Sequence, residues 1–178
     1  QLVEIDIPGA RIAARYPSQN AAMLNDVAVA ENGDVYVSDS RGSAIFRLAD
    51  GRLEEWLRTP AVTLPNGIAV HGGRLIVATN GDRSLKAVDL ATKAVSVIAT
   101  LHRGLLDGVD VDDDGNYLVS YNEGMLLRVT PRGEVTTLLD LTGPGTNIAD
   151  FDYVPERNLL VFPTFVDNRV IAYRIERR

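Results

Sequence analysis

The chain repeats itself about every forty-one residues, and this repeat limits the fold more than any other feature of the sequence. Four segments align: LNDVAVAENGDVYVSDSRGSAIFRLADGRLEEWL, LPNGIAVHGGRLIVATNGDRSLKAVDLATKAVSVI, LDGVDVDDDGNYLVSYNEGMLLRVTPRGEVTTLL and IADFDYVPERNLLVFPTFVDNRVIAYRI. Asn25, Asn66, Asp107 and Ala149 occupy equivalent positions, which gives spacings of 41, 41 and 42 residues by subtraction. A repeat of this period is typical of a β-propeller, in which each repeat forms one blade.

Within each repeat, apolar residues alternate with polar or small residues, which is the period of a β-strand. The turn pairs Asn32-Gly33, Gly72-Gly73 and Asp114-Gly115 follow the first strand at equivalent places, and such pairs favour hairpins. Three further short strands complete each repeat, although the last repeat stops after its third strand. We therefore predict an all-β protein, a single β-propeller domain over residues 1–178, with about four four-stranded blades that start near 24, 65, 106 and 148.

The segment before the first repeat, QLVEIDI at 1–7, reads as a lone strand that completes another blade. It could complete the last blade and close a four-bladed ring, which would remove the exposed edges. Alternatively, it is the outer strand of an earlier blade, and the chain is part of a six-bladed wheel. The sequence does not choose between these two arrangements.

Composition excludes several classes of protein. The 178 residues carry a net charge of −6, so a nucleic-acid backbone would be repelled. The absence of cysteine excludes disulfides and thiolate metal sites. No apolar run approaches the roughly 20 residues that span a bilayer, and the chain as given shows no leader. We expect a soluble cytoplasmic or periplasmic protein that acts on a small molecule; the sequence does not indicate its oligomeric state.

Oxygen-bearing side chains stand just before the first strand of three consecutive repeats. Because first strands lie innermost in a propeller, Asn25, Asn66 and Asp107 should converge at one end of the central channel, and Asp150 could add a fourth oxygen. Amide and carboxylate oxygens suit a hard divalent cation, most simply calcium. The plainer interpretation is that asparagine and aspartate merely begin strands, because both favour turns.

The segments LNDVAV, LPNGIAV and LDGVDV, followed by YNEGMLLRVTP, resemble the family of gluconolactonase, regucalcin and the luciferin-regenerating enzyme, which are six-bladed propellers. The resemblance implies that Asn25, Asn66 and Asp107 face an axial metal ion. It also implies that Asp107 is the catalytic residue, as base or nucleophile. The family motif Y-N-x-G-x-x-x-R is matched by Tyr121, Asn122, Gly124 and Arg128.

The chain also departs from this family. The glutamate ligand of the family's first blade has no counterpart in the four repeats. Met23 stands where the family usually has a basic residue, which argues against an anionic sugar-acid substrate. Val27 replaces the glycine of the family's N-D-G stretch.

A second aspartate-rich stretch, DVDDDG, resembles the start of an EF-hand loop through Asp110, Asp112, Asp114 and Gly115. An EF-hand requires a glutamate at its twelfth position, which is Tyr121 here, and flanking helices, where this chain has strands. We therefore predict a hairpin turn. Asp110 is the exception, because it belongs to an inner strand, and we expect it to line the channel.

Two functions follow from these patterns. The first is a small-molecule ester or lactone hydrolase that uses a divalent cation, with Asp107 as the catalytic residue and Asp150, Tyr121 and Asp110 in contact with the substrate. The second is a non-catalytic scaffold or ligand-binding propeller of the NHL-repeat kind, because propellers host many unrelated functions.

Overall fold

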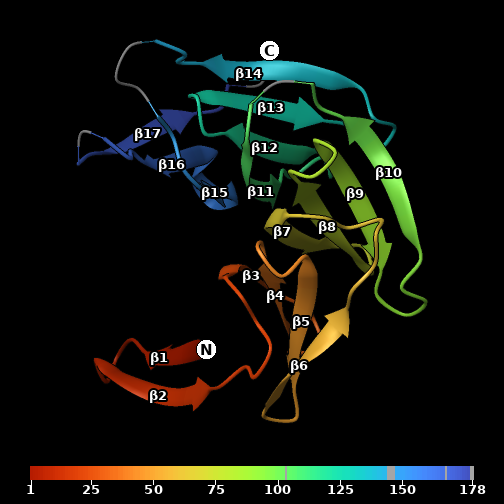
Figure 1. Cartoon of the computed structure of the whole chain (residues 1–178). Coiled ribbons are helices and arrows are strands. Elements are labelled where there is room, and N and C mark those ends of the chain that lie inside the picture. The colour runs from red at the N-terminus through yellow and green to blue at the C-terminus, as the bar shows by residue number, and fades with distance from the viewer. Residues whose placement is uncertain (103, 144–146, 167, 177–178) are drawn as a thin grey trace.

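Four antiparallel sheets stand around a common axis in the computed structural model, which describes residues 1–102, 104–143, 147–166 and 168–176. Figure 1 shows their first strands, β3, β7, β11 and β15, nearest the centre. Among the described residues the regular structure is β apart from one short 3-10 turn, η1 (Pro155–Arg157). The predicted all-β propeller is therefore confirmed.

Each of the first three blades has four strands that pair in chain order. The strands of the first blade are β3 (Leu24–Val29), β4 (Val35–Asp39), β5 (Ala44–Ala49) and β6 (Arg52–Leu57). Those of the second are β7 (Pro65–His71), β8 (Arg74–Thr79), β9 (Ser84–Asp89) and β10 (Val95–Thr100). Those of the third are β11 (Leu106–Val111), β12 (Tyr117–Tyr121), β13 (Met125–Val129) and β14 (Val135–Asp140). The last sheet contains β15 (Asp152–Val154), β16 (Leu159–Pro163) and β17 (Val170–Arg174).

The core lies between the blades, because successive side chains of a strand point to opposite faces of its sheet. In β12, Tyr117 and Val119 pack against the second blade, while Leu118 packs against the last one. The central strands are therefore buried on both faces, which explains their nearly continuous apolar sequences. The turns between first and second strands match the prediction: Gly33 and Gly115 have φ of 87° and 77°, a region that favours glycine.

The N-terminal segment differs from the expected lone strand. Strand β1 (Leu2–Asp6) pairs with β2 (Arg11–Tyr16) in a hairpin, and the described part of the last sheet contains only β15, β16 and β17. Apolar and polar residues alternate only weakly in RIAARY, so the sequence did not predict the second strand. Leu2 and Tyr16 pack against the first blade, where they cover Val37 and Phe46.

The last blade differs from the others by one residue in register. Asp110 lies opposite Leu118 in the third blade, and the sequence repeat predicts the same for Asp152 and Leu160. Instead Asp152 lies opposite Val161. The 3-10 turn η1 replaces the tight hairpin turn of the other blades, and residues 155–158 connect β15 to β16 where 112–116 connect β11 to β12.

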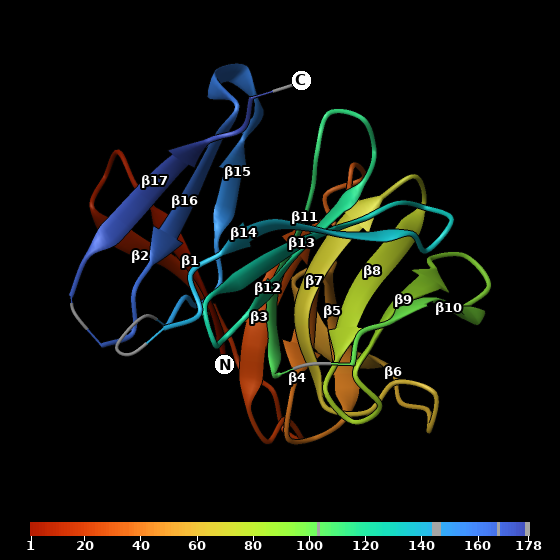
Figure 2. The same ribbon diagram turned by 90° about the horizontal axis from the view of Figure 1, so that it is seen from above.

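The hairpin and β15–β17 lie on the same side of the molecule in Figures 1 and 2. Both elements carry exposed apolar side chains, which include Ile5 and Ile12 of the hairpin and Val170 of β17. No helix among the described residues is long and apolar enough to cross a membrane.

Candidate functional site

A β-bulge at the start of each of the first three inner strands shapes one end of the axis. The pairing with the second strand shifts between Leu24 and Val27 in β3, between Pro65 and Ile68 in β7, and between Leu106 and Val109 in β11. The bulged residues are therefore 25–26, 66–67 and 107–108. A bulge bends its strand and redirects its side chains, which explains why the predicted residues leave the regular face of each sheet.

Side chains from the second strand satisfy backbone groups within these bulges. Ser38 Oγ accepts the N–H of Asp26 at 3.0 Å, and Ser120 Oγ accepts the N–H of Gly108 at 2.8 Å. Both serines are fully buried. They hold the bulges of the first and third blades in the same way, because a buried N–H without a partner would be costly.

Glycine lets the inner strands approach closely at this end. A Cβ atom on Gly67 would lie 2.1 Å from the backbone oxygen of Asp107, and one on Gly108 would lie 2.1 Å from Oδ1 of Asp150. A larger residue at Gly67 would have to displace the backbone of the third blade, and one at Gly108 would have to displace the side chain of Asp150. The glycines of the P-N-G and L-D-G segments thus bring the bulges of successive blades together.

Three of the predicted site residues meet in this way. Asn25 Nδ2 donates to Asn66 Oδ1 at 2.5 Å and to Ser40 Oγ at 2.9 Å. Asn66 in turn hydrogen-bonds the side chain of Asp107 and donates through Nδ2 to the backbone oxygen of Leu106 at 2.9 Å. Side chains that are 41 residues apart in the sequence therefore form one polar chain across three blades.

The pKa of the Asp107 carboxyl is raised above its ordinary value. Burial is the main cause, the negative charge of Asp150 adds to it, and the hydrogen bond from Asn66 opposes both. A carboxylate in such a setting holds a proton more readily than an exposed one, which suits a group that accepts a proton from water.

An acidic cavity of about 370 Å³ continues from this mouth along the axis. Its carboxylates come from three inner segments of the chain: Asp26, Asp110, Asp150 and Asp152. Burial raises the pKa of Asp110 and Asp150, and the charge of Asp152 adds to the effect in both. The structure thus places two of the predicted substrate-contacting residues, Asp110 and Asp150, beside one cavity.

Asp26 was not predicted from the sequence. Its pKa is raised to about 7, first by burial and then by the charge of Asp150. The equivalent positions in the next two repeats are Gly67 and Gly108, so no shared residue type marked this position. The signal that could have found it is Asp150, which occupies the same place in the fourth repeat.

Tyr121 lies elsewhere. Its side chain is 3 % exposed and belongs to the core between the second and third blades. It lines a separate cavity of about 520 Å³ together with His102, Met125 and Asp140. The structure therefore does not bring Tyr121 to the axial mouth with Asn25, Asn66 and Asp107.

The DVDDDG stretch forms a turn, as predicted. Oδ1 of Asp112 accepts the backbone N–H of Asp114 at 3.0 Å and that of Asn116 at 2.8 Å. These bonds make an aspartate-stabilised turn between β11 and β12. Among the described residues, no group of three or more His, Cys, Asp and Glu side chains is arranged to hold a metal ion.

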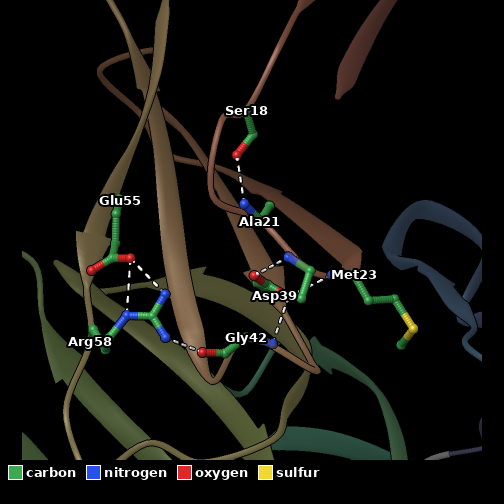
Figure 3. A network of polar contacts seen from close by, with 8 residues as sticks. Ser18, Ala21, Met23, Asp39, Gly42, Glu55 and Arg58 are labelled. Atoms are coloured by element: carbon green, nitrogen blue, oxygen red, sulfur yellow. Dashed lines mark hydrogen bonds and ion pairs between the residues drawn. The ribbon is translucent and has the colours of Figure 1, made fainter.

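The loop that leads into β3 is held by a buried carboxylate, shown in Figure 3. Asp39 is fully buried and accepts the N–H groups of Ala22, Met23 and Gly42 at 2.8, 2.7 and 2.9 Å. Burial raises its pKa, but these three hydrogen bonds and the charge of Arg58 together outweigh burial, so the pKa lies below its ordinary value. This carboxylate fixes the segment immediately before Asn25.

The donor set at the mouth fits a hard cation in its chemistry. Asn25, Asn66 and Asp107 offer two amide oxygens and one carboxylate, with the charge of Asp150 nearby. A half-turn of the Asn25 amide exchanges its nitrogen for its oxygen and would present both amide oxygens to an ion. Oxygen donors of this kind are those that calcium prefers.

Comparison with solved structures places the fold among known propellers. A gluconolactonase from Xanthomonas campestris is 22% identical, with a TM-score of 0.72 over 91% of this chain and 61% of that one. A putative gluconolactonase is 24% identical, with a TM-score of 0.70 over 93% of this chain and 63% of that one. Virginiamycin B lyase from Staphylococcus aureus is 16% identical, with a TM-score of 0.69 over 99% of this chain and 63% of that one.

No protein-family model and no curated protein matches the chain. The chain spans about six-tenths of the length of these similar structures. The predicted resemblance to the gluconolactonase-like propellers therefore holds for the fold, which this chain shares with gluconolactonases and with a lyase.

Proposed function

We propose that the protein is a small-molecule ester or lactone hydrolase that works with a divalent cation, calcium being the best fit, at the mouth of the axial channel. The observation that carries this proposal is the chain of contacts from Asn25 to Asn66 to Asp107, which gathers oxygen donors from three blades. The similarity to gluconolactonase structures supports the same choice at the level of the fold.

In this proposal Asp107 acts as the general base. It accepts a proton from a water molecule whose oxygen attacks the carbonyl carbon of the substrate. The bond between that carbon and the ring or alkoxy oxygen then breaks, and the departing oxygen takes a proton, which leaves a carboxylic acid and an alcohol. A divalent cation bound at these oxygens would polarise the carbonyl group.

Asp150 and Asp110 are proposed to contact the substrate, because both line the axial cavity next to this mouth. Their carboxylates can accept hydrogen bonds from hydroxyl groups of a substrate. Tyr121 is left out of the proposed site, because its side chain lines a different cavity.

The alternative is a non-catalytic binding propeller. The contact between Asn25 and Asn66 favours it, since Asn66 Oδ1 accepts a hydrogen bond from Asn25 Nδ2 and so has a partner without an ion. The chain also spans only part of the length of the similar enzymes, so their activities do not transfer to it directly.

Thermal unfolding in calcium and in chelator tests the cation. An ion that binds only the folded state at a hundred times its Kd stabilises that state by about 2.7 kcal/mol. We expect the melting temperature to rise with calcium, and Asp107→Asn to lose most of this response. Asp112→Asn is the matched control, because it makes the same chemical change in the turn between β11 and β12. An equal calcium response in both variants would remove Asp107 from the site.

Hydrolysis is tested with a panel of lactones and aryl esters, with acid release followed by a pH indicator. We expect calcium-dependent release that Asp107→Asn reduces by a hundred-fold or more, about the range of a lost general base. Calcium binding without turnover of any member of the panel would favour the binding propeller instead.

A further inference from the structure

An exposed apolar side chain stands two residues before each of the three mouth residues. Met23, Leu64 and Leu105 precede Asn25, Asn66 and Asp107, and they are 37, 45 and 54 % exposed. Single exposed apolar residues are common on protein surfaces. Three at equivalent positions around one polar mouth form a repeated feature of the fold, and we name Met23, Leu64 and Leu105 the apolar rim.

The same backbone hydrogen bond holds each member of the rim. The residue that follows the second strand donates its N–H to the rim residue's carbonyl oxygen at 3.0 Å in all three blades. The pairs are Ser40 to Met23, Asn80 to Leu64 and Asn122 to Leu105. The rim residues therefore occupy the same place in each blade, at the end of the axis where the polar chain lies.

In the last blade the equivalent bond runs from Phe165 to the carbonyl oxygen of Asn147 at 3.3 Å. The rim position itself is polar there, but Phe165 is large, apolar and 66 % exposed. The last blade thus also presents an exposed apolar side chain at this end.

Leu64 adopts a backbone conformation that is unfavourable for leucine. Its φ is +47°, in the left-handed region, which costs a residue with a Cβ atom roughly 1 kcal/mol or more. Asparagine or glycine would fit this backbone better, and an exposed leucine side chain gains little from burial in return. A strained residue of this kind is more often found where a site needs its side chain.

We propose that the apolar rim sets the substrate class of the mouth: a neutral ester or lactone that carries an apolar substituent. This inference rests on the proposed function for the reaction, but not for the binding of the substituent. The rim offers an apolar surface around a polar centre, so a substrate would place its carbonyl group at Asn25, Asn66 and Asp107 and its substituent against the rim. The acidic cavity below and the absence of a basic residue at Met23 disfavour an anionic substrate.

The expected preference follows from the area that the rim removes from water. Each methylene buried in a protein contributes about four-fold in affinity, from roughly 0.8 kcal/mol per group. A hexyl tail that buries a fraction of its length against the rim should therefore gain about ten-fold to a hundred-fold over the unsubstituted ring.

Binding is measured first, with lactams, which keep the ring and carbonyl of a lactone but resist hydrolysis. Hexyl-substituted piperidinone and unsubstituted piperidinone are titrated calorimetrically into the full chain with calcium. We expect the hexyl compound to bind at least about ten-fold more tightly, and the preference to fall to about three-fold or less in the double variant Leu64→Asn/Leu105→Asn. Leu138→Gln is the matched control, because Leu138 is an exposed leucine on the outer strand β14.

Equal affinity of the two lactams, no binding of either, or an unchanged preference in the double variant would overturn the rim inference. Hydrolysis of the matching lactones is assayed separately. If the lactones are hydrolysed without a preference for the hexyl compound and the two lactams bind equally, the hydrolase proposal stands and the rim inference is wrong. If the hexyl lactam binds more tightly in a rim-dependent way but no lactone is hydrolysed, the rim is a binding surface and the hydrolase proposal is wrong.

Discussion

The carboxylate of Asp26 in β3 accepts a hydrogen bond from the backbone N–H of Ile68 in β7, with 2.7 Å between oxygen and nitrogen. The third and fourth blades repeat this relationship, because Oδ2 of Asp110 accepts the N–H of Tyr153 at 2.9 Å. Inner strands of neighbouring blades are thus joined by aspartate side chains as well as by packing. Their protonation states therefore bear on the stability of the axis.

We predict that the calcium-free protein loses stability as the pH rises from about 4 to about 7. The pKa of Asp26 is raised to about 7 from 3.8, so the folded state binds this proton more tightly than the unfolded state does. The protonated Asp26 carboxyl contributes its full stabilisation below the pKa of the unfolded state. This contribution is lost as the pH rises through the pKa of the folded state, and each unit between the two pKa values corresponds to about 1.4 kcal/mol. Urea unfolding in chelator at several pH values measures the slope.

Asp26→Asn should flatten this pH dependence and stabilise the protein at pH values above about 7. The variant keeps an oxygen that can accept the N–H of Ile68. Glu31→Gln serves as an exposed control in the turn region near the other end of β3. A slope as steep in Asp26→Asn as in the original protein would show that another group is responsible.

We predict that Asp39→Ala destabilises the fold by about 3 kcal/mol or more, because three N–H groups around a fully buried site lose their acceptor. Asp39→Asn should cost less, since one oxygen can still accept the N–H groups of Met23 and Gly42. The pKa of Asp39 is lowered in the folded state. Its contribution to stability is therefore present at pH values above the ordinary pKa of an aspartate, and it is lost as the pH falls through the pKa of the folded state.

Equilibrium unfolding of both variants at neutral and mildly acidic pH tests this prediction. Glu31→Ala, at an exposed position, should change stability by about 0.5 kcal/mol or less. If Asp39→Ala behaved like that control, the network in Figure 3 would not hold the loop before β3.

We predict that Gly67→Ala costs about 3 kcal/mol and weakens the calcium response. Its Cβ would lie 2.1 Å from the backbone oxygen of Asp107, so β7 and β11 must separate and carry Asn66 away from Asp107. Gly143→Ala is the matched control, because its nearest neighbour is the backbone oxygen of Leu141 at 3.9 Å. Both variants are compared by urea unfolding with and without calcium. Equal stability of Gly67→Ala and Gly143→Ala would show that β7 and β11 can accommodate a Cβ atom at position 67.

We predict that Leu64→Asn leaves stability unchanged or raises it by up to about 1 kcal/mol, because asparagine tolerates positive φ better than leucine does. Leu105→Asn should show no such gain, since Leu105 is not among the described residues with positive φ. Thermal unfolding of the two single variants makes the comparison. A clear loss of stability in Leu64→Asn would contradict this prediction, because it would show that the Leu64 side chain makes stabilising contacts despite its exposure.

The repeat predicted much of the architecture because blade strands obey local rules. Alternation of apolar residues and turn pairs such as Asp114-Gly115 specify strands and hairpins without any information from distant residues. Equivalent positions in a propeller converge on one axis, so the contact of Asn25 with Asn66 followed from their spacing alone. The turn at Asp112 followed in the same way.

Other features depend on contacts that no spacing reveals. Asp26 shares its structural position with glycines, so the repeat concealed it, and its raised pKa arises from burial and from Asp150 across the axis. Tyr121 matches a family motif, but the alternation along β12 turns its side chain into the core between blades. In the last blade, the turn η1 replaces the hairpin turn and the strand register is shifted by one residue, which the aligned sequences do not reveal.

The carbonyl oxygen of each rim residue accepts from the residue after the second strand of its own blade, and no backbone hydrogen bond of the described residues joins two rim residues. Substitutions at Met23, Leu64 and Leu105 should therefore act independently, with effects that add. The rim residues can therefore be substituted for a new ligand one blade at a time, while the polar residues at the centre and the strands that carry them stay unchanged.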